Sequence, residues 1–330
     1  MLRSGSVLVL VLLLGFAVPE AARACSVCLA GDPQYSAFGA SAQQAGDVSL
    51  YFQVQGWRKE SGLLPHDEEE EEGEEEHGPG TERNRSERLD LFVAWTPIDR
   101  LTLSLDVPFA HNEIEEIEGD ERETHTLQGL GDISLSATTV LWRNRDVLPS
   151  TWLEGRAFLK TPTGRHERKR GGVVDPHLQT GTGSWDFGFG LGGAHKLEWG
   201  SLYASVFYRE NGDGHFDGLD YEYGDNLLAN LALDVPMGHA LGRPGLDWLT
   251  LGAELNYRWA DFDRADGQKY RDSGGSLLYF TPVMRFQLPF GVRERPMSLR
   301  VAVQLPVTSS WLYGDQDEKE VWSVGLQVPF

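Results

Sequence analysis

The chain ends, from Glu320 to Phe330, with the sequence EVWSVGLQVPF. Apolar side chains stand at every second position from Trp322 to Val328, and the last residue is aromatic. Because successive side chains of a β-strand point to opposite faces of its sheet, this spacing predicts a strand with one apolar face. The prediction for the whole chain depends on how often the same spacing returns upstream.

The same alternation returns along most of the chain. In the segment 48–55, Val48, Leu50 and Phe52 alternate with Ser49 and Tyr51. Together with the terminal segment, the alternating stretches predict about 12 strands. The further stretches lie at 89–95, 101–107, 133–141, 153–159, 185–191, 202–208, 227–235, 249–257, 278–288 and 299–307.

The connections between these stretches alternate in length. Those at 59–86, 110–128, 163–184, 210–222, 260–274 and 309–319 are long, and those at 96–100, 143–150, 198–200, 236–246 and 290–297 are short. Outer-membrane barrels have short periplasmic turns and long external loops, whereas a soluble β-sandwich has no reason to keep this rhythm. We therefore expect an all-β fold, a transmembrane antiparallel up-and-down β-barrel over 46–330. Both termini would be periplasmic, and 59–86 would be a long acidic external loop.

The strand face opposite the apolar one carries charged side chains. A closed barrel in lipid gives one face hydrocarbon and the other water, and it leaves no unpaired backbone edge. We expect the charges to line a narrow polar lumen. The candidate lumen residues are Asp90, Asp106, Glu154, Arg156, Lys160, Glu254, Arg258, Arg285 and Arg300.

Both ends of the chain indicate export to the bacterial outer membrane. Arg3 precedes an apolar run from Val7 to Val18, which is too short for a spanning helix, and small residues frame a cleavage point after Ala24. This pattern predicts a cleaved signal peptide over 1–24. The terminal Phe330 matches the aromatic end that the barrel-assembly machinery recognises, so we expect it to act as an assembly signal. The expected partners are that machinery and outer-membrane lipid.

Segment 25–45 is expected to be periplasmic, and it begins with the chain's two cysteines, Cys25 and Cys28. Leu29 follows the second cysteine where c-type haem attachment would need histidine. A disulfide is the default in an oxidising compartment, while thiol exchange with a periplasmic partner or a metal site with ligands from elsewhere stays open. Lipidation of Cys25 also stays open, because a lipoprotein signal would make it the first mature residue.

The charge balance excludes one class of partner and raises a question about metals. With 29 basic and 50 acidic residues the formal charge is −21, so nucleic acid is not an expected partner. His66 and His77 flank the acidic run 67–76, and His111 and His125 flank a second acidic stretch. Imidazole and carboxylate together suit divalent metals, although acidic external loops also bind such ions unspecifically. Beyond a divalent metal at these loops, no cofactor is expected.

Three short motifs carry a family resemblance. They are Gly-Leu-Gly-Asp at 129–132, Lys-Thr-Pro-Thr-Gly at 160–164 and Gly-Thr-Gly-Ser-Trp-Asp at 181–186. With these motifs, the chain from about Gly46 to Phe330 resembles the MetA-pathway-of-phenol-degradation family of outer-membrane transporter-like β-barrels. It departs from the family at Lys160-Thr161, where leucine is usual before Pro-Thr-Gly, and in the acidic run 67–76. The resemblance implies passage of small solutes, aromatic or hydrophobic compounds among them.

The resulting functional hypothesis is a channel or transporter, not an enzyme, that passes small solutes through a narrow polar lumen. The alternative is a barrel without a conducting channel, whose acidic and histidine-bearing loops or Cys25 and Cys28 bind a metal or a partner. A third hypothesis is a lipid-modifying barrel enzyme. His195 is the one histidine within a predicted strand, no serine partner stands out, and no catalytic residue is assigned.

Overall fold

The computed structural model describes most of the chain from residue 45 onward. The signal segment 1–24, Cys25 and Cys28 lie outside the described residues, as do His66 and His77. The described ranges are 45–62, 81–118, 121–146, 148–167, 169–170, 173–174, 176–216, 219–269, 273–292, 295–308, 312–313 and 316–330.

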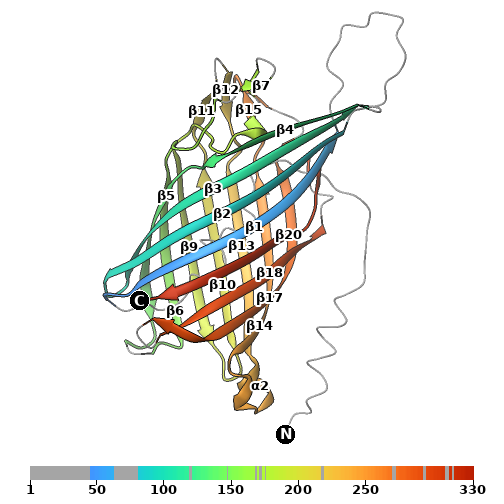
Figure 1. Ribbon diagram of the computed structural model, residues 1–330. Helices are drawn as coiled ribbons and strands as arrows, with labels where there is room; N and C mark the ends of the chain where they lie inside the picture. Colours follow the sequence, from blue (N-terminus) through green and yellow to red (C-terminus); the bar gives the residue numbers. More distant parts are fainter. Residues whose placement is uncertain are drawn as a thin grey trace, which may run out of the picture.

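Twelve long strands form one closed antiparallel sheet in the described part of the chain (Figure 1). Each of these strands pairs with the next along the chain, and β20 pairs with β1, so the sheet closes on itself. This confirms the predicted antiparallel up-and-down barrel of 12 strands; the periplasmic position of both termini stays a prediction. The strands are β1 (Val48–Gly62), β2 (Thr81–Ile98), β3 (Leu101–Glu118), β5 (Ser134–Arg143), β6 (Thr151–Lys160), β9 (Asp186–Lys196), β10 (Ser201–Glu210), β13 (Asn226–Pro236), β14 (Leu249–Ala260), β17 (Gly275–Val292), β18 (Arg295–Thr308) and β20 (Val321–Pro329).

The barrel closes where the last strand meets the first. Residues 49–56 of β1 pair with 322–329 of β20, and the Phe330 N–H donates to the carbonyl of Val48 at 2.8 Å. The short strand β19 (Gln316–Glu318) continues this pairing along 59–61 of β1. The terminal stretch that first indicated a strand is therefore the one that seals the sheet.

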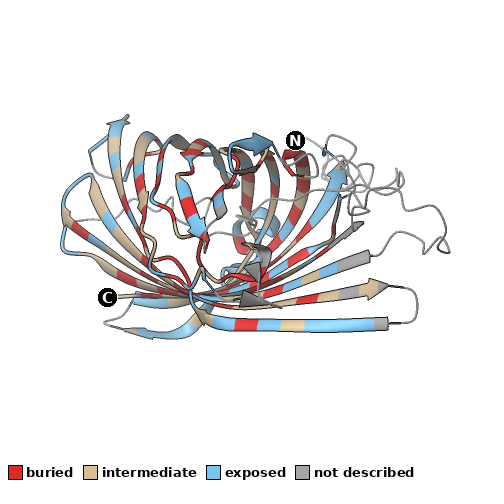
Figure 2. Cartoon of the chain, turned by 90° about the horizontal axis from the view of Figure 1, so that it is seen from above, coloured by how far each residue is buried: buried red, intermediate tan, exposed pale blue. Residues whose placement is uncertain are grey.

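The two faces of the barrel differ in composition, and exposed and buried segments follow one another along the strands (Figure 2). The outward face is apolar and exposed: Phe52, Val54, Leu89, Leu103, Leu135, Leu153, Phe189, Val206, Leu231, Leu255, Met284 and Val324. The inward face is largely polar and buried: Gln53, Gln55, Asp90, Asp106, Ser134, Lys160, Asp186, Asn226, Asp234, Glu254, Thr281 and Arg300. This distribution is the one that a barrel surrounded by lipid requires.

The two ends of the barrel carry different connections (Figure 1). The short-turn end holds α2 (Met237–Leu241) and η3 (Pro244–Leu246). In the turn between β5 and β6 at this end, hydrogen bonds from Arg143 and Arg100 lower the pKa of Asp146. No helix in the described ranges is long and apolar enough to span a membrane. The opposite, long-loop end holds β4 (Glu121–Leu130), β7 (Lys169–Arg170), β8 (Val173–Val174), η2 (Pro176–Leu178), β11 (Asp213–Phe216), β12 (Leu219–Glu222), β15 (Arg264–Ala265) and β16 (Gln268–Lys269).

Two predicted loops are partly wrong, because strands continue into them. β1 runs to Gly62 and β2 starts at Thr81, inside the predicted loop 59–86, and β3 and β4 occupy most of 110–128. These extensions lack an apolar face that repeats every second residue, so the sequence pattern missed them. Backbone pairing and cross-strand pairs of opposite charge hold them instead, such as Arg83 with Glu115 at 3.7 Å.

A charge on the outward face should destabilise the barrel. Leu231 lies near the middle of β13, is 46% exposed and stands opposite Leu255 of β14. Leu231→Arg should lower the free energy of unfolding by about 2–4 kcal/mol, because the guanidinium would enter hydrocarbon. Urea unfolding of the protein refolded into phospholipid vesicles measures the change. Gln268→Arg in exposed β16 is the control; equal stability of both variants would contradict a lipid-facing position for Leu231.

Candidate functional site

The candidate site is the barrel interior, and the nine predicted lumen residues all lie on the barrel strands. Glu154, Arg156 and Arg285 are half-buried. The other six are buried by the structure: Asp90, Asp106, Lys160, Glu254, Arg258 and Arg300. Buried charges are costly unless they are paired, so their partners decide what the interior can do.

The first charge cluster lies on β2 and β3. Arg88 contacts Asp90 through its Nε and donates from Nη2 to Asp106 at 3.2 Å. Ser134 of β5 donates to Asp106 at 3.5 Å, and the Gln55 amide donates to Asp90 at the same distance. Arg88 was missing from the predicted site, although it stands two residues before Asp90 and therefore on the same face.

A second cluster surrounds Lys160 at the long-loop end of β6. Its Nζ lies 2.7 Å from Asp186 and 3.2 Å from Asp132, and it also contacts the Thr182 hydroxyl. Asp132 accepts the backbone N–H groups of Gly164 and Thr182, each at 2.8 Å. These residues come from the three motifs at 129–132, 160–164 and 181–186, so the folded chain brings the motifs together.

The motif glycines allow this convergence. A Cβ on Gly181 would lie 2.6 Å from the Cα of Gly164 and 2.7 Å from a carboxylate oxygen of Asp132. No side chain fits at that separation, so the two loop segments can approach this closely only because glycine stands at both positions. These glycines belong to the motifs that carry the family resemblance, and their physical role is to make room for the buried Asp132 carboxylate.

Four of the remaining predicted charges are paired across β13, β14, β17, β18 and β19, while Arg156 of β6 donates to the hydroxyl of Thr138 at 3.2 Å. Arg300 donates to Glu254 at 2.8 Å, and Arg285 donates to Asp234 at 2.7 Å. Arg258 donates to Glu318 at 3.2 Å. Their positions along the strands spread these pairs over the height of the interior.

Two of these partners were not among the predicted site residues. Asp234 could have been chosen from the alternation within 227–235. Glu318 lies in the predicted loop 309–319, which β19 brings onto β1, and so only the fold reveals it. Near Glu318, the guanidinium of Arg258 also stacks over the ring of Tyr279 at 5.0 Å from its centroid.

An apolar cluster lies next to the Lys160 cluster, two residues earlier on β6. Phe158 of β6 and Phe207 of β10 meet edge to face, with ring centroids 5.9 Å apart, and Leu228 of β13 packs against them. β9 lies between their strands and offers glycine there: a Cβ on Gly188 would lie 2.4 Å from the Phe207 ring. The rings thus cover the backbone of β9. Above them a cavity of about 110 Å³ remains in the interior.

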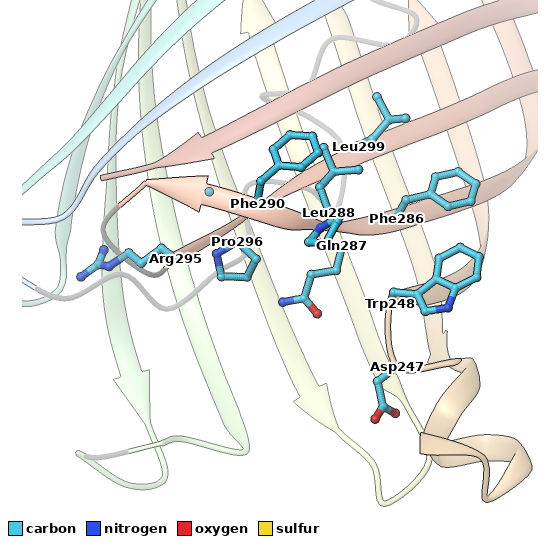
Figure 3. Close-up of a pocket in the computed structure, with 11 residues that line it drawn as sticks. Asp247, Trp248, Phe286, Gln287, Leu288, Phe290, Arg295, Pro296 and Leu299 are labelled. Carbon is cyan, nitrogen blue, oxygen red and sulfur yellow. The ribbon is translucent and has the colours of Figure 1, made fainter. Parts of the chain in front are cut away.

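A larger groove of about 970 Å³ lies at the short-turn end (Figure 3). The connection between β13 and β14 forms one side, and the hairpin of β17 and β18 forms the other. Trp248 stacks on Phe286 with ring centroids 6.0 Å apart, and Phe290 and Leu299 continue the apolar wall. Phe286 stands opposite Leu249 on the outward face, so this groove faces lipid, where aromatic side chains mark the membrane boundary.

The predicted metal site stays a prediction. His111 lies on β3 and His125 on β4, where its Nε2 is 2.9 Å from Glu123, and both belong to strands instead of the predicted loop. Among the described residues, no group of three or more histidine, cysteine, aspartate or glutamate side chains could hold a metal. His66, His77, Cys25 and Cys28 lie outside those residues.

His195, considered for a lipid-modifying enzyme, lies at the short-turn end of β9 and is exposed. Its Nδ1 is 2.8 Å from the hydroxyl of Thr151, directly opposite on β6. A nucleophilic triad needs a third group that orients the imidazole, and this pair supplies a hydroxyl and an imidazole only. Thr151 was not a candidate from the sequence, because the enzyme hypothesis considered only serine as a partner for His195.

The comparisons with known proteins support the fold. No family model matches the chain, and no curated protein matches it. Among solved structures, the chain is similar to the COG4313 outer membrane channel from Pseudomonas putida F1, with 16% identity, a TM-score of 0.61 and coverage of 88% of this chain and 97% of that one. A FadL homologue from Pseudomonas aeruginosa aligns with 11% identity and a TM-score of 0.46, over 93% of this chain and 99% of that one. The likeness to the channel from Pseudomonas putida F1 shows that the chain has the fold of an outer-membrane barrel.

Removing the charge of one residue in an interior ion pair should destabilise the barrel more than removing the charges of both residues. Arg300→Met would leave Glu254, which is 3% exposed, without its guanidinium, at an expected cost of about 3–5 kcal/mol. Arg300→Met combined with Glu254→Gln should recover part of that loss. Urea unfolding in vesicles measures both variants. If the double variant is less stable than the single one, the carboxylate is not the source of the cost.

Proposed function

We propose that this chain is an outer-membrane channel that passes small solutes through a narrow polar interior. The observation that supports it is the set of paired charges on the inward face, spread from Arg285 near the short-turn end to Lys160 near the long-loop end. A barrel that served only as an anchor could fill its interior with apolar side chains at lower cost. Charges along the whole height favour a path for water and polar groups.

A narrow interior is part of this proposal. The cluster of Phe158, Phe207 and Leu228 and the ion pairs are buried, and a barrel of 12 strands is small enough for such side chains to restrict the path. Solutes that pass must therefore be small, or side chains must move. The resemblance to the MetA-pathway family adds aromatic or hydrophobic compounds as candidate solutes.

The packed interior also favours the second hypothesis, a barrel that does not conduct. In that case the long-loop end, or Cys25 and Cys28, would bind a metal or a periplasmic partner. Purified protein that shows no conductance in planar bilayers, while it binds zinc or copper tightly, would support this alternative and contradict the channel.

The channel hypothesis predicts that interior charge controls ion selectivity. Arg285 is the most suitable residue, because its side chain is 23% exposed and so contacts water inside the barrel. Arg285→Gln should change the selectivity toward cations by roughly twofold, since one positive charge leaves the path. Reversal potentials across a salt gradient in planar bilayers measure this ratio.

The matched control is Arg100→Gln, which removes one positive charge from the turn between β2 and β3 at the short-turn end. Its selectivity should equal that of the wild type. If the wild type opens, and Arg285→Gln and Arg100→Gln both have the wild-type ion selectivity, ions do not pass Arg285.

A further inference from the structure

We propose that the cavity beside Arg209 binds the carboxylate of a short-chain monocarboxylic acid. The proposal rests on the proposed function, because it names a solute class for the same interior. The cavity measures about 110 Å³ and lies at the long-loop end, between the Lys160 cluster and η2. A water molecule takes roughly 30 Å³ in the liquid, so the space suits a ligand of only a few heavy atoms.

Arg209 is the feature that points to a ligand. It lies on β10 with 4% of its surface exposed, and it lines the cavity. The nearest carboxylate, Asp186, is 3.7 Å from its Nε, beyond hydrogen-bonding distance. That Nε has no hydrogen-bond partner among the described residues. A buried N–H of a guanidinium without an acceptor is costly, and an anionic oxygen in the cavity would relieve that cost.

The neighbouring charges are already engaged with one another. Lys160 pairs with Asp132 and Asp186, and Asp132 also accepts the N–H groups of Gly164 and Thr182. Asp186 accepts the hydroxyl of Ser184 at 2.7 Å. Lys160 and Asp132 therefore have their own partners, and the Asp186 Oδ2 that lies 3.7 Å from Arg209 makes no hydrogen bond to its Nε. That N–H is left for a further acceptor.

The first charge cluster, on β2 and β3, also lies beside the cavity and is likewise paired. Arg88 contacts both Asp90 and Asp106, and Asp106 also accepts the hydroxyl of Ser134. Of the charged side chains that line the cavity, Arg88, Lys160 and Arg209 are basic and Asp106 and Asp132 are acidic. Asp90 and Asp186 pair with these basic groups from outside the lining, so the preference for an anion comes from the Nε–H of Arg209 and not from a surplus of positive charge.

The shape of the lining favours a carboxylate over a simple halide. The planar guanidinium presents parallel N–H groups that match the two oxygens of a carboxylate. Phe158, Pro108 and Ala110 form an apolar part of the wall. A carboxylate at Arg209 would place a short alkyl group against that wall.

Propionate binding to the full-length protein in detergent micelles tests the proposal, with saturation-transfer NMR or calorimetry as the readout. Propionate should bind, whereas propionamide, which has the same shape without the charge, should not. Arg209→Gln should weaken propionate binding by roughly tenfold or more, because a charge-assisted bond is lost. Arg209→Lys keeps the charge but loses the parallel N–H groups of the guanidinium, so it should weaken propionate binding less. Arg100→Gln should bind propionate like the wild type.

The heat-dependent mobility shift of folded barrels on gels shows whether each variant is closed, and Arg209→Lys serves if Arg209→Gln does not fold. The site would be overturned if propionate does not bind, or if propionamide binds equally well. It would also be overturned if chloride displaces bound propionate as well as propionate itself does, or if the folded Arg209 variants bind propionate as the wild type does. Conductance separates the two proposals. If the protein conducts but does not bind propionate, the channel proposal stands and the carboxylate site is refuted. If it binds propionate but does not conduct, the site stands and the channel proposal is refuted.

Discussion

The pairing of β20 with β1 is the interaction on which the rest of the structure depends. In hydrocarbon, every strand amide must find a partner within the protein, and a sheet that stays open would leave two edges unpaired. Closure satisfies them all at once. It also separates the two faces of every strand, because alternate side chains must then point either to lipid or to the interior.

Closure makes the interior a confined place for charge. Side chains that would be hydrated on an open sheet face one another across a small cross-section, and they are paired: Arg300 with Glu254, Arg285 with Asp234, Arg258 with Glu318. Such pairs stabilise less than their short distances suggest, because each charge loses its hydration. Their presence along the interior is better explained by a polar path for solutes than by a gain in stability.

The long-loop end adds a second layer of structure above the lipid-facing band. Phe216 of β11 and Tyr221 of β12 pack with Tyr223, and these two strands form a small sheet with β15 and β16. The amide of Asn112 donates to the carbonyls of Leu178 and Gln179, and so fixes η2 against β3. The cavity beside Arg209 is therefore bounded by residues from loops that lie far apart in the sequence.

The sequence by itself determined the strands and the direction of their side chains. Alternation is a local property, since two neighbouring residues suffice to show which face is apolar, and the length of the connections then indicates a barrel. It also supplied the candidate lumen charges, which the folded chain places on the strands. The sequence pattern failed where strands run without an apolar face, as in the extensions of β1 to β4, because pairing there depends on the partner strand.

Only the tertiary structure decided which charges meet. The pairs of Arg258 with Glu318 and of Lys160 with Asp132 join residues that are distant in the chain, and their separation depends on strand register and loop path. The same holds for Arg209, whose residue type and position are ordinary for an inward-facing strand residue. That its Nε lacks a hydrogen-bond partner among the described residues emerges only in the closed barrel, because the distance to Asp186 depends on how the strands pair.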